Sequence, residues 1–155
     1  MSSEQNRVCF VVAPIGDPES ETRRRSDQIL KHVIVPVCES VGYKPVRADQ
    51  ISEPGIITTQ VIQHIIDDAM VIADLSGRNP NVFYELGIAH ALKKPVVLVS
   101  SNEEDVPFDV RHIRVIYYDV NDPFWGEKLV NKVAENIVSA LTNPEEAIFR
   151  SGVAG

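Results

Sequence analysis

Five short segments that read as strands, most of them apolar and separated by helical patterns, constrain the fold of this chain most strongly. The segments span residues 7–13, 43–47, 70–74, 95–100 and 113–118. Continuous apolar runs of this length are typical of strands that are buried on both faces. Because strands that alternate with helices are joined by crossovers, the pattern predicts a parallel sheet with helices on both sides.

Apolar residues at helical spacing lie between these segments. They predict helices over 22–41, 57–69, 80–93 and 124–141, with a polar loop over 101–112. Pro36 lies inside the first helix and is expected to kink or interrupt it. Right-handed crossovers favour a flavodoxin-like α/β fold, a three-layer sandwich with a five-stranded parallel sheet of order 2-1-3-4-5. We expect one domain over residues 1–142 and a flexible C-terminal tail over residues 143–155.

The composition narrows the classes of partner and compartment. The chain has 155 residues and a formal net charge of −7, which argues against binding to nucleic acid or to an anionic membrane. Cys9 and Cys38 lie in apolar segments and are expected to be reduced core residues. We see no signal peptide, no apolar run of membrane-spanning length and no metal-ligand spacing. We therefore expect a cytoplasmic protein with no metal and no bound cofactor.

Glu85 is the least expected residue of the predicted helix over 80–93. It lies three, four and seven residues before the apolar positions of one predicted stripe, which are Ile88, Ala89 and Leu92. A buried acid is costly without a partner, so a carboxylate on such a stripe suggests a functional role. The alternative is a surface glutamate, or a buried one that backbone groups satisfy. We treat Glu85 as the candidate nucleophile or cation-stabilising residue.

The predicted strand order places a ligand crevice between strands 1 and 3, because the direction of winding reverses there. Strand 1 ends at Pro14-Ile15-Gly16, where Gly16 allows close approach of a ligand to the backbone. Strand 3 ends at Asp74, which either caps a turn, holds a ribose hydroxyl or protonates a leaving base. The residues around both strand ends are therefore candidates for one site.

Three further candidates lie at the start of the third helix. Asn79 suits the N-cap position and Pro80 the first helical position, although Asn79 is also a substrate-binding candidate. Asn81 lies one turn before Glu85 and is the candidate to orient its carboxylate. Tyr84 either packs as an aromatic residue or bonds a carboxylate or sugar through its hydroxyl.

A basic cluster, Arg23-Arg24-Arg25-Ser26, stands out in this acidic chain. Cations at the start of a helix oppose its dipole, so helix stability does not explain their placement. Either they form a solvated helix start, or Arg24 or Arg25, together with Ser26 and backbone N–H groups, binds a phosphate. Asp109 either pairs with Arg111 or contributes to substrate binding.

The segment over residues 72–87 resembles the nucleoside 2-deoxyribosyltransferase-like superfamily and the related bacterial TIR-like domains of antiphage defence. The opening residues 10–16 and the stretch over 24–27 also resemble these families, and the resemblance extends over roughly residues 7–119. It implies a flavodoxin-like fold in which Glu85, within Glu-Leu-Gly, is the catalytic glutamate. Asn79 stands where the transferases often have an aspartate, which argues against base exchange between nucleosides. Hydrolysis of a nucleotide or of NAD fits the arginine cluster better.

Together these features predict an enzyme that breaks an N-glycosidic bond by hydrolysis or transfer. Such bonds break through an oxocarbenium-like state, which a carboxylate stabilises or captures. We expect a nucleotide-like substrate, NAD or a (deoxy)nucleotide, with NAD as substrate and not as cofactor, and Glu85, Asp74 and Asn81 as the catalytic group. The alternatives are a non-catalytic nucleotide sensor and a TIR-like self-assembly module. The resemblance also implies a homodimer or a higher oligomer.

Overall fold

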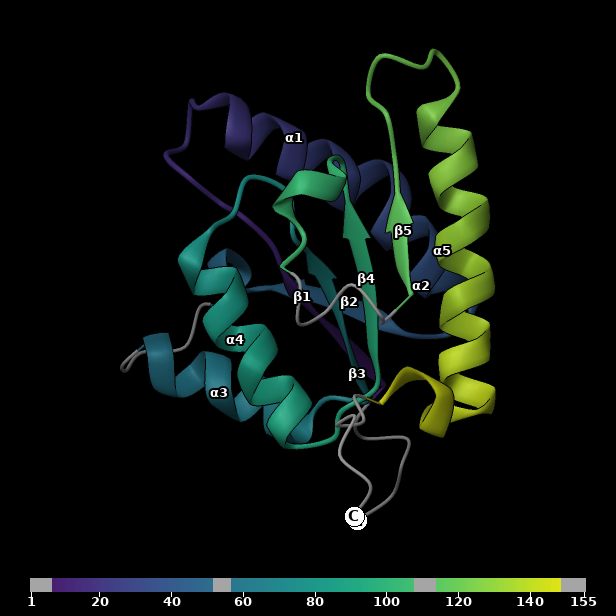
Figure 1. Ribbon diagram of the computed structural model, residues 1–155. Helices are drawn as coiled ribbons and strands as arrows, with labels where there is room; N and C mark the ends of the chain where they lie inside the picture. Colours follow the sequence, from purple (N-terminus) through teal and green to yellow (C-terminus); the bar gives the residue numbers. More distant parts are fainter. Residues whose placement is uncertain (1–6, 52–56, 108–113, 149–155) are drawn as a thin grey trace.

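Five parallel strands in the order β2-β1-β3-β4-β5 form the central layer of the fold (Figure 1). The computed structural model describes residues 7–51, 57–107 and 114–148. The strands are β1 (Val8–Val12), β2 (Lys44–Arg47), β3 (Met70–Asp74), β4 (Val96–Ser100) and β5 (Val115–Tyr117). The predicted strand order and the flavodoxin-like fold are therefore confirmed.

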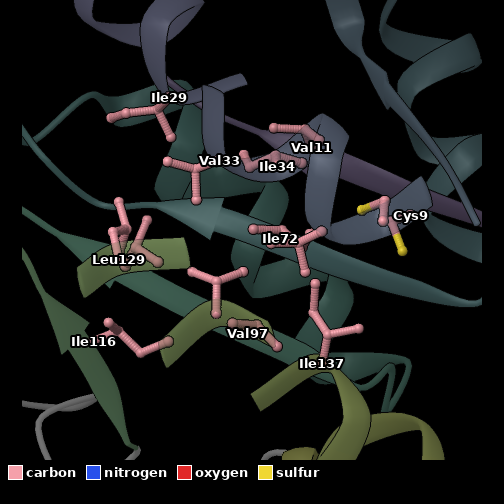
Figure 2. Packing of buried hydrophobic residues seen from close by; sticks show 14 of the residues in the cluster. Cys9, Val11, Ile29, Val33, Ile34, Ile72, Val97, Ile116, Leu129 and Ile137 are labelled. Atoms are coloured by element: carbon pink, nitrogen blue, oxygen red, sulfur yellow. The ribbon is translucent and has the colours of Figure 1, made fainter. Parts of the chain in front are cut away.

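Helices cover both faces of the sheet, which explains why the central strands β3 and β4 are buried along their whole length (Figure 1). One face carries α1 (Glu21–Ile29), α2 (Val35–Ser40) and α5 (Trp125–Thr142), and the other carries α3 (Ile57–Asp67) and α4 (Pro80–Ala91). Side chains alternate along a strand, so Ile72 of β3 packs towards α1 and α5, whereas Ala73 packs towards α3 and α4. Figure 2 shows the first of these clusters, with Ile72 and Val97 among residues of α1 and α5.

The helix that contains Pro36 is continuous but changes its winding. A π-helical turn, η2 (Leu30–Ile34), joins α1 to α2, and the N–H of Val35 donates to the carbonyl of Leu30. Pro36 has no N–H to donate, and it lies in the first turn of α2, directly after the wider π-helical turn. The predicted interruption is thus a wider turn that keeps both halves of the helix packed on the sheet.

The buried stripe of α4 differs from the predicted one. It consists of Val82, Leu86 and Ala89, whereas Leu92 is 48% exposed. The predicted stripe was therefore wrong in its register around the helix. Glu85 lies at the edge of the buried face, beside Leu86, and is partly buried.

Short 3-10 helices complete the described chain: η3 (Ala48–Gln50), η4 (Glu103–Asp105) and η6 (Pro144–Ala147). The second of these lies in the predicted polar loop, and the third lies at the start of the predicted tail. Residues 149–155 of that tail lie outside the described residues. No helix in the described ranges is long and apolar enough to cross a membrane.

Candidate active site

A pocket of about 510 Å³ opens at the carboxyl end of β1, between the first turns of α3 and α4. This is the edge at which the winding reverses between β1 and β3, where ligands bind in folds of this type. Its volume is in the range of small-molecule sites. The residues that line it are Val11, Ala13, Ile15, Gly16, Ala48, Thr58, Val61, Ile62, Asn79, Asn81, Tyr84 and Glu85.

The start of α4 brings several polar side chains to this pocket. Asn79 caps the helix, because its Oδ1 accepts hydrogen bonds from the N–H groups of Asn81 at 2.9 Å and Val82 at 3.4 Å. The cap fixes where the helix begins, so Asn81 and Glu85, which are one turn apart, both line the pocket. The expected cap at Asn79 is confirmed, and the same residue also lines the pocket.

Burial raises the pKa of Glu85 from 4.5 to about 6. Among the described residues, no hydrogen bond or ion pair compensates its carboxylate, so loss of water is the cause of the shift. The carboxylate is still mostly ionised at neutral pH. A partly buried acid without a partner, in a pocket, is the pattern by which functional carboxylates are recognised.

The walls of the pocket differ in polarity. Val61 and Ile62 of α3, together with Ile15, supply apolar surface, whereas the start of α4 supplies amides, a carboxylate and the 61% exposed Tyr84. No lining residue that the structure describes carries a positive charge. In the described ranges, no group of three or more metal-binding side chains comes together either. The arrangement suits an uncharged, partly apolar ligand moiety with hydroxyl groups near α4.

Asp74 ends β3 but lies on the face of the sheet away from α4. Its Oδ1 accepts a hydrogen bond from the N–H of Ser76 at 3.0 Å, and its Oδ2 accepts one from the hydroxyl of Tyr118 at 3.1 Å. It is 4% exposed, and burial raises its pKa although the bonds from Ser76 and the charge of Arg25 oppose this rise. The structure therefore does not bring Asp74 into the pocket with Glu85.

The basic cluster at the start of α1 is largely engaged with the protein itself. Arg24 donates through Nη1 to the carbonyl of Glu19 at 3.1 Å. Ser26 is buried, and its Oγ accepts a hydrogen bond from Nη1 of Arg47 at 2.7 Å. Gly16 lines the pocket, but Arg24, Arg25 and Ser26, which were predicted to bind a phosphate, are not among its lining residues.

The structure thus gathers about half of the residues predicted from the sequence. Those in the pocket are Ile15, Gly16, Asn79, Asn81, Tyr84 and Glu85. Those outside its lining are Pro14, Arg24, Arg25, Ser26 and Asp74, and Asp109 lies outside the described residues. Sequence reasoning missed the apolar lining of Ala48, Val61 and Ile62, although the periodicity that predicted α3 already marked Val61 and Ile62 as apolar positions of that helix.

Solved structures share this fold over most of the chain. A CMP N-glycosidase from Clostridium botulinum aligns with a TM-score of 0.56 and 18% identity, over 81% of this chain and 96% of that one. A 2-deoxyribosyltransferase from Bacillus psychrosaccharolyticus aligns with a TM-score of 0.53 and 15% identity, over 79% and 90% of the two chains. No family model and no curated protein matches the sequence. The chain therefore has a nucleoside 2-deoxyribosyltransferase-like fold, and at these identities the fold is what is shared.

Proposed function

We propose that the protein breaks the N-glycosidic bond of a nucleoside or nucleotide, by hydrolysis or by transfer, with Glu85 as the catalytic residue. The observation that carries the proposal is the carboxylate of Glu85, which has no partner among the described residues and lies in a pocket of about 510 Å³. The two enzymes of similar fold support it, since one is named as an N-glycosidase of CMP and the other as a deoxyribosyltransferase.

In the proposed reaction, the bond between the anomeric carbon and the base nitrogen breaks, and its electron pair leaves with the base. Positive charge then develops on the anomeric carbon and the ring oxygen. The carboxylate of Glu85 stabilises this charge, or captures the carbon as an ester that water or a second base later attacks. Asn81 and Tyr84 line the pocket beside it and contact the sugar or orient the carboxylate.

The two walls of the pocket suit two different parts of the substrate, the base and the sugar. The base lies against the apolar side chains of Val61 and Ile62, and the sugar lies over α4 near Glu85. Free nucleosides, (deoxy)nucleotides and NAD all contain this unit, and NAD enters as a substrate. A panel of these compounds therefore decides which of them the protein uses.

A non-catalytic nucleotide sensor is the second candidate, and one observation favours it. Glu85 is the only carboxylic acid among the described lining residues, because Asp74 lies on the other face of the sheet. No second acid among these residues stands ready to protonate a leaving base. In this alternative the pocket binds the same ligands without turnover.

The test is incubation with nucleosides, nucleotides and NAD, with the released free base measured by mass spectrometry. We expect Glu85→Gln to lower base release by about a thousandfold or more, since it removes the charge that meets the developing cation. The control is Glu39→Gln, because Glu39 is an exposed glutamate of α2 remote from the pocket lining. Unchanged release in Glu85→Gln would end the proposal. Binding by calorimetry without turnover in the natural protein would favour the sensor.

A further inference from the structure

We propose that the segment Arg23–Asp27 is a brace that holds two loops of the pocket in place and lies against a third, with Arg23 as the positioning residue for the wall formed by Ile15 and Gly16. The expected effect of the brace on catalysis rests on the proposed function, but its expected effect on the order of the loop after β1 does not. The brace also explains why a basic cluster stands at the start of a helix.

The first loop follows β1. Arg23 donates through Nε to the carbonyl of Ile15 at 3.0 Å and through Nη2 to the carbonyl of Gly16 at 3.3 Å. Gly16 has φ of +63°, a conformation that glycine adopts without strain. Because both carbonyls belong to residues that line the pocket, the guanidinium holds this wall from behind.

Ser20 reinforces the same connection. Its Oγ donates to the carbonyl of Asp17 at 2.7 Å and accepts from the N–H of Arg23 at 3.1 Å. The side chains of Ser20 and Arg23 therefore both join the loop after β1 to the first turn of α1. Loss of the Arg23 side chain releases the loop at Ile15 and Gly16, but the cap stays in place because Ser20 accepts from the backbone N–H of residue 23.

The second loop follows β2. Arg47 is 3% exposed and donates to Ser26 at 2.7 Å, to Asp27 at 2.5 Å and twice to Asp49, at 2.6 and 2.9 Å. The next residue, Ala48, lines the pocket. Ser26 and Asp27 thus fasten α1 to the strand end that supplies this part of the wall.

The third loop joins β3 to α4. The charge of Arg25 acts on the buried pair of Asp74 and Tyr118, and a Cβ placed on Gly77 would lie 3.8 Å from Nη2 of Arg25. Nε of Arg25 is buried without a hydrogen-bond partner among the described residues. This arginine therefore lies against the loop that leads to Asn79.

These contacts explain the position of the basic cluster without a bound phosphate. Arg23 donates to two loop carbonyls from one guanidinium, which supplies several donors in a fixed geometry. Bonds from a charged group outweigh the unfavourable position of a cation at a helix start. Successive residues of one helix can thus fasten separate loops at the same edge of the sheet.

The structural test needs no ligand and no activity. Backbone order parameters from NMR relaxation are measured on the natural protein, on Arg23→Gln and on Arg24→Gln, where Arg24 donates to the carbonyl of Glu19 outside the pocket lining. We expect the order parameters of residues 15–17 to fall to about 0.6 or below in Arg23→Gln, with the strands unchanged, and to stay the same in Arg24→Gln. Equal order parameters for residues 15–17 in all three proteins would overturn the proposal.

The kinetic test compares a nucleoside with its 5′-phosphate. A displaced wall lowers kcat/KM about tenfold for both compounds, so their ratio stays constant in Arg23→Gln. A loss confined to the phosphorylated compound would show that Arg23 contacts phosphate, and would contradict the brace. The control is Lys31→Gln, which removes a positive charge from an exposed residue of η2. If Arg23→Gln does not fold, Arg23→Lys, which keeps the charge and a single donor group, replaces it in both tests.

Discussion

Asp74 and Glu85 lie on opposite faces of the sheet, although only ten residues separate them. Asp74 accepts a hydrogen bond from Tyr118 on the face covered by α1 and α5, whereas Glu85 lies on α4, which covers the other face. The pocket consequently contains one of these two carboxylates and not both. The acid on β3 is hydrogen-bonded within the protein, whereas the acid on α4 lines the pocket.

The first prediction follows from this separation. We expect Asp74→Asn to keep base release within about tenfold of the natural protein, because the amide oxygen still accepts the bond from Ser76 and the amide N–H group donates to the hydroxyl of Tyr118 in place of the bond that it loses. Tyr118→Phe removes a buried hydroxyl and is expected to lower the free energy of unfolding by about 1–2 kcal/mol. Base release at equal folded concentration and urea denaturation measure the two effects. A loss in Asp74→Asn as large as that in Glu85→Gln would mean that Asp74 takes part in the reaction.

The second prediction concerns pH and activity. Burial raises the pKa of Glu85 to about 6, so its carboxylate becomes ionised as the pH rises through this value. We expect kcat/KM for base release to rise with pH, with a midpoint near 6, and then to level off. The substrate must be one whose base does not titrate in this range. A rate that is constant from acid to neutral pH would exclude ionised Glu85 as the required form.

The third prediction concerns stability. Because the pKa of Glu85 is raised on folding from 4.5 to about 6, the carboxylate destabilises the folded state above this range and not below it. Glu85→Gln is therefore expected to match the natural protein near pH 4 and to be more stable by about 1 kcal/mol above pH 7, after allowing for solvent screening. Urea denaturation at both pH values tests this. A variant that is less stable at neutral pH would show that the carboxylate has a compensating partner.

The fourth prediction compares two glycines. Gly16 has φ of +63°, and a Cβ there would lie 2.8 Å from Oγ of Ser20 and 3.1 Å from Cβ of Thr22. Gly16→Ala is expected to lower the free energy of unfolding by about 1–3 kcal/mol and to distort the pocket wall. Gly87 lies in α4, and a Cβ added there would meet open space, so Gly87→Ala is expected to raise stability by about 0.5–1 kcal/mol. Thermal denaturation distinguishes the two, and equal effects would contradict the argument.

Much of the fold could be predicted because its central strands are buried on both faces. β3 spans Met70–Asp74, the same range that its apolar run predicts. The buried face of α4 could not be predicted, because that helix is apolar at most positions and its periodicity is weak. The position of Leu92 depends on how α4 rotates against the sheet, which tertiary packing decides.

The site could be predicted in part because the strand order could be predicted. Topology fixes the edge at which β1 and β3 end, and this places Gly16 and Glu85 in one pocket. The direction of Asp74 depends on strand register, in which Cys9 of β1 lies opposite Met70 of β3. The bonds of Arg23 depend on a loop conformation that turns two carbonyls towards it. Neither feature leaves a local pattern in the sequence.

The contact between Tyr118 and the only tryptophan of the chain, Trp125, has a practical consequence. The two rings lie 5.8 Å apart on the face of the sheet that carries the buried acid of β3. Intrinsic tryptophan emission therefore monitors the integrity of that layer. Occupancy of the pocket, in contrast, is expected to alter the ultraviolet signal of Tyr84 at its rim. Two built-in optical probes thus separate unfolding from ligand binding without any added label.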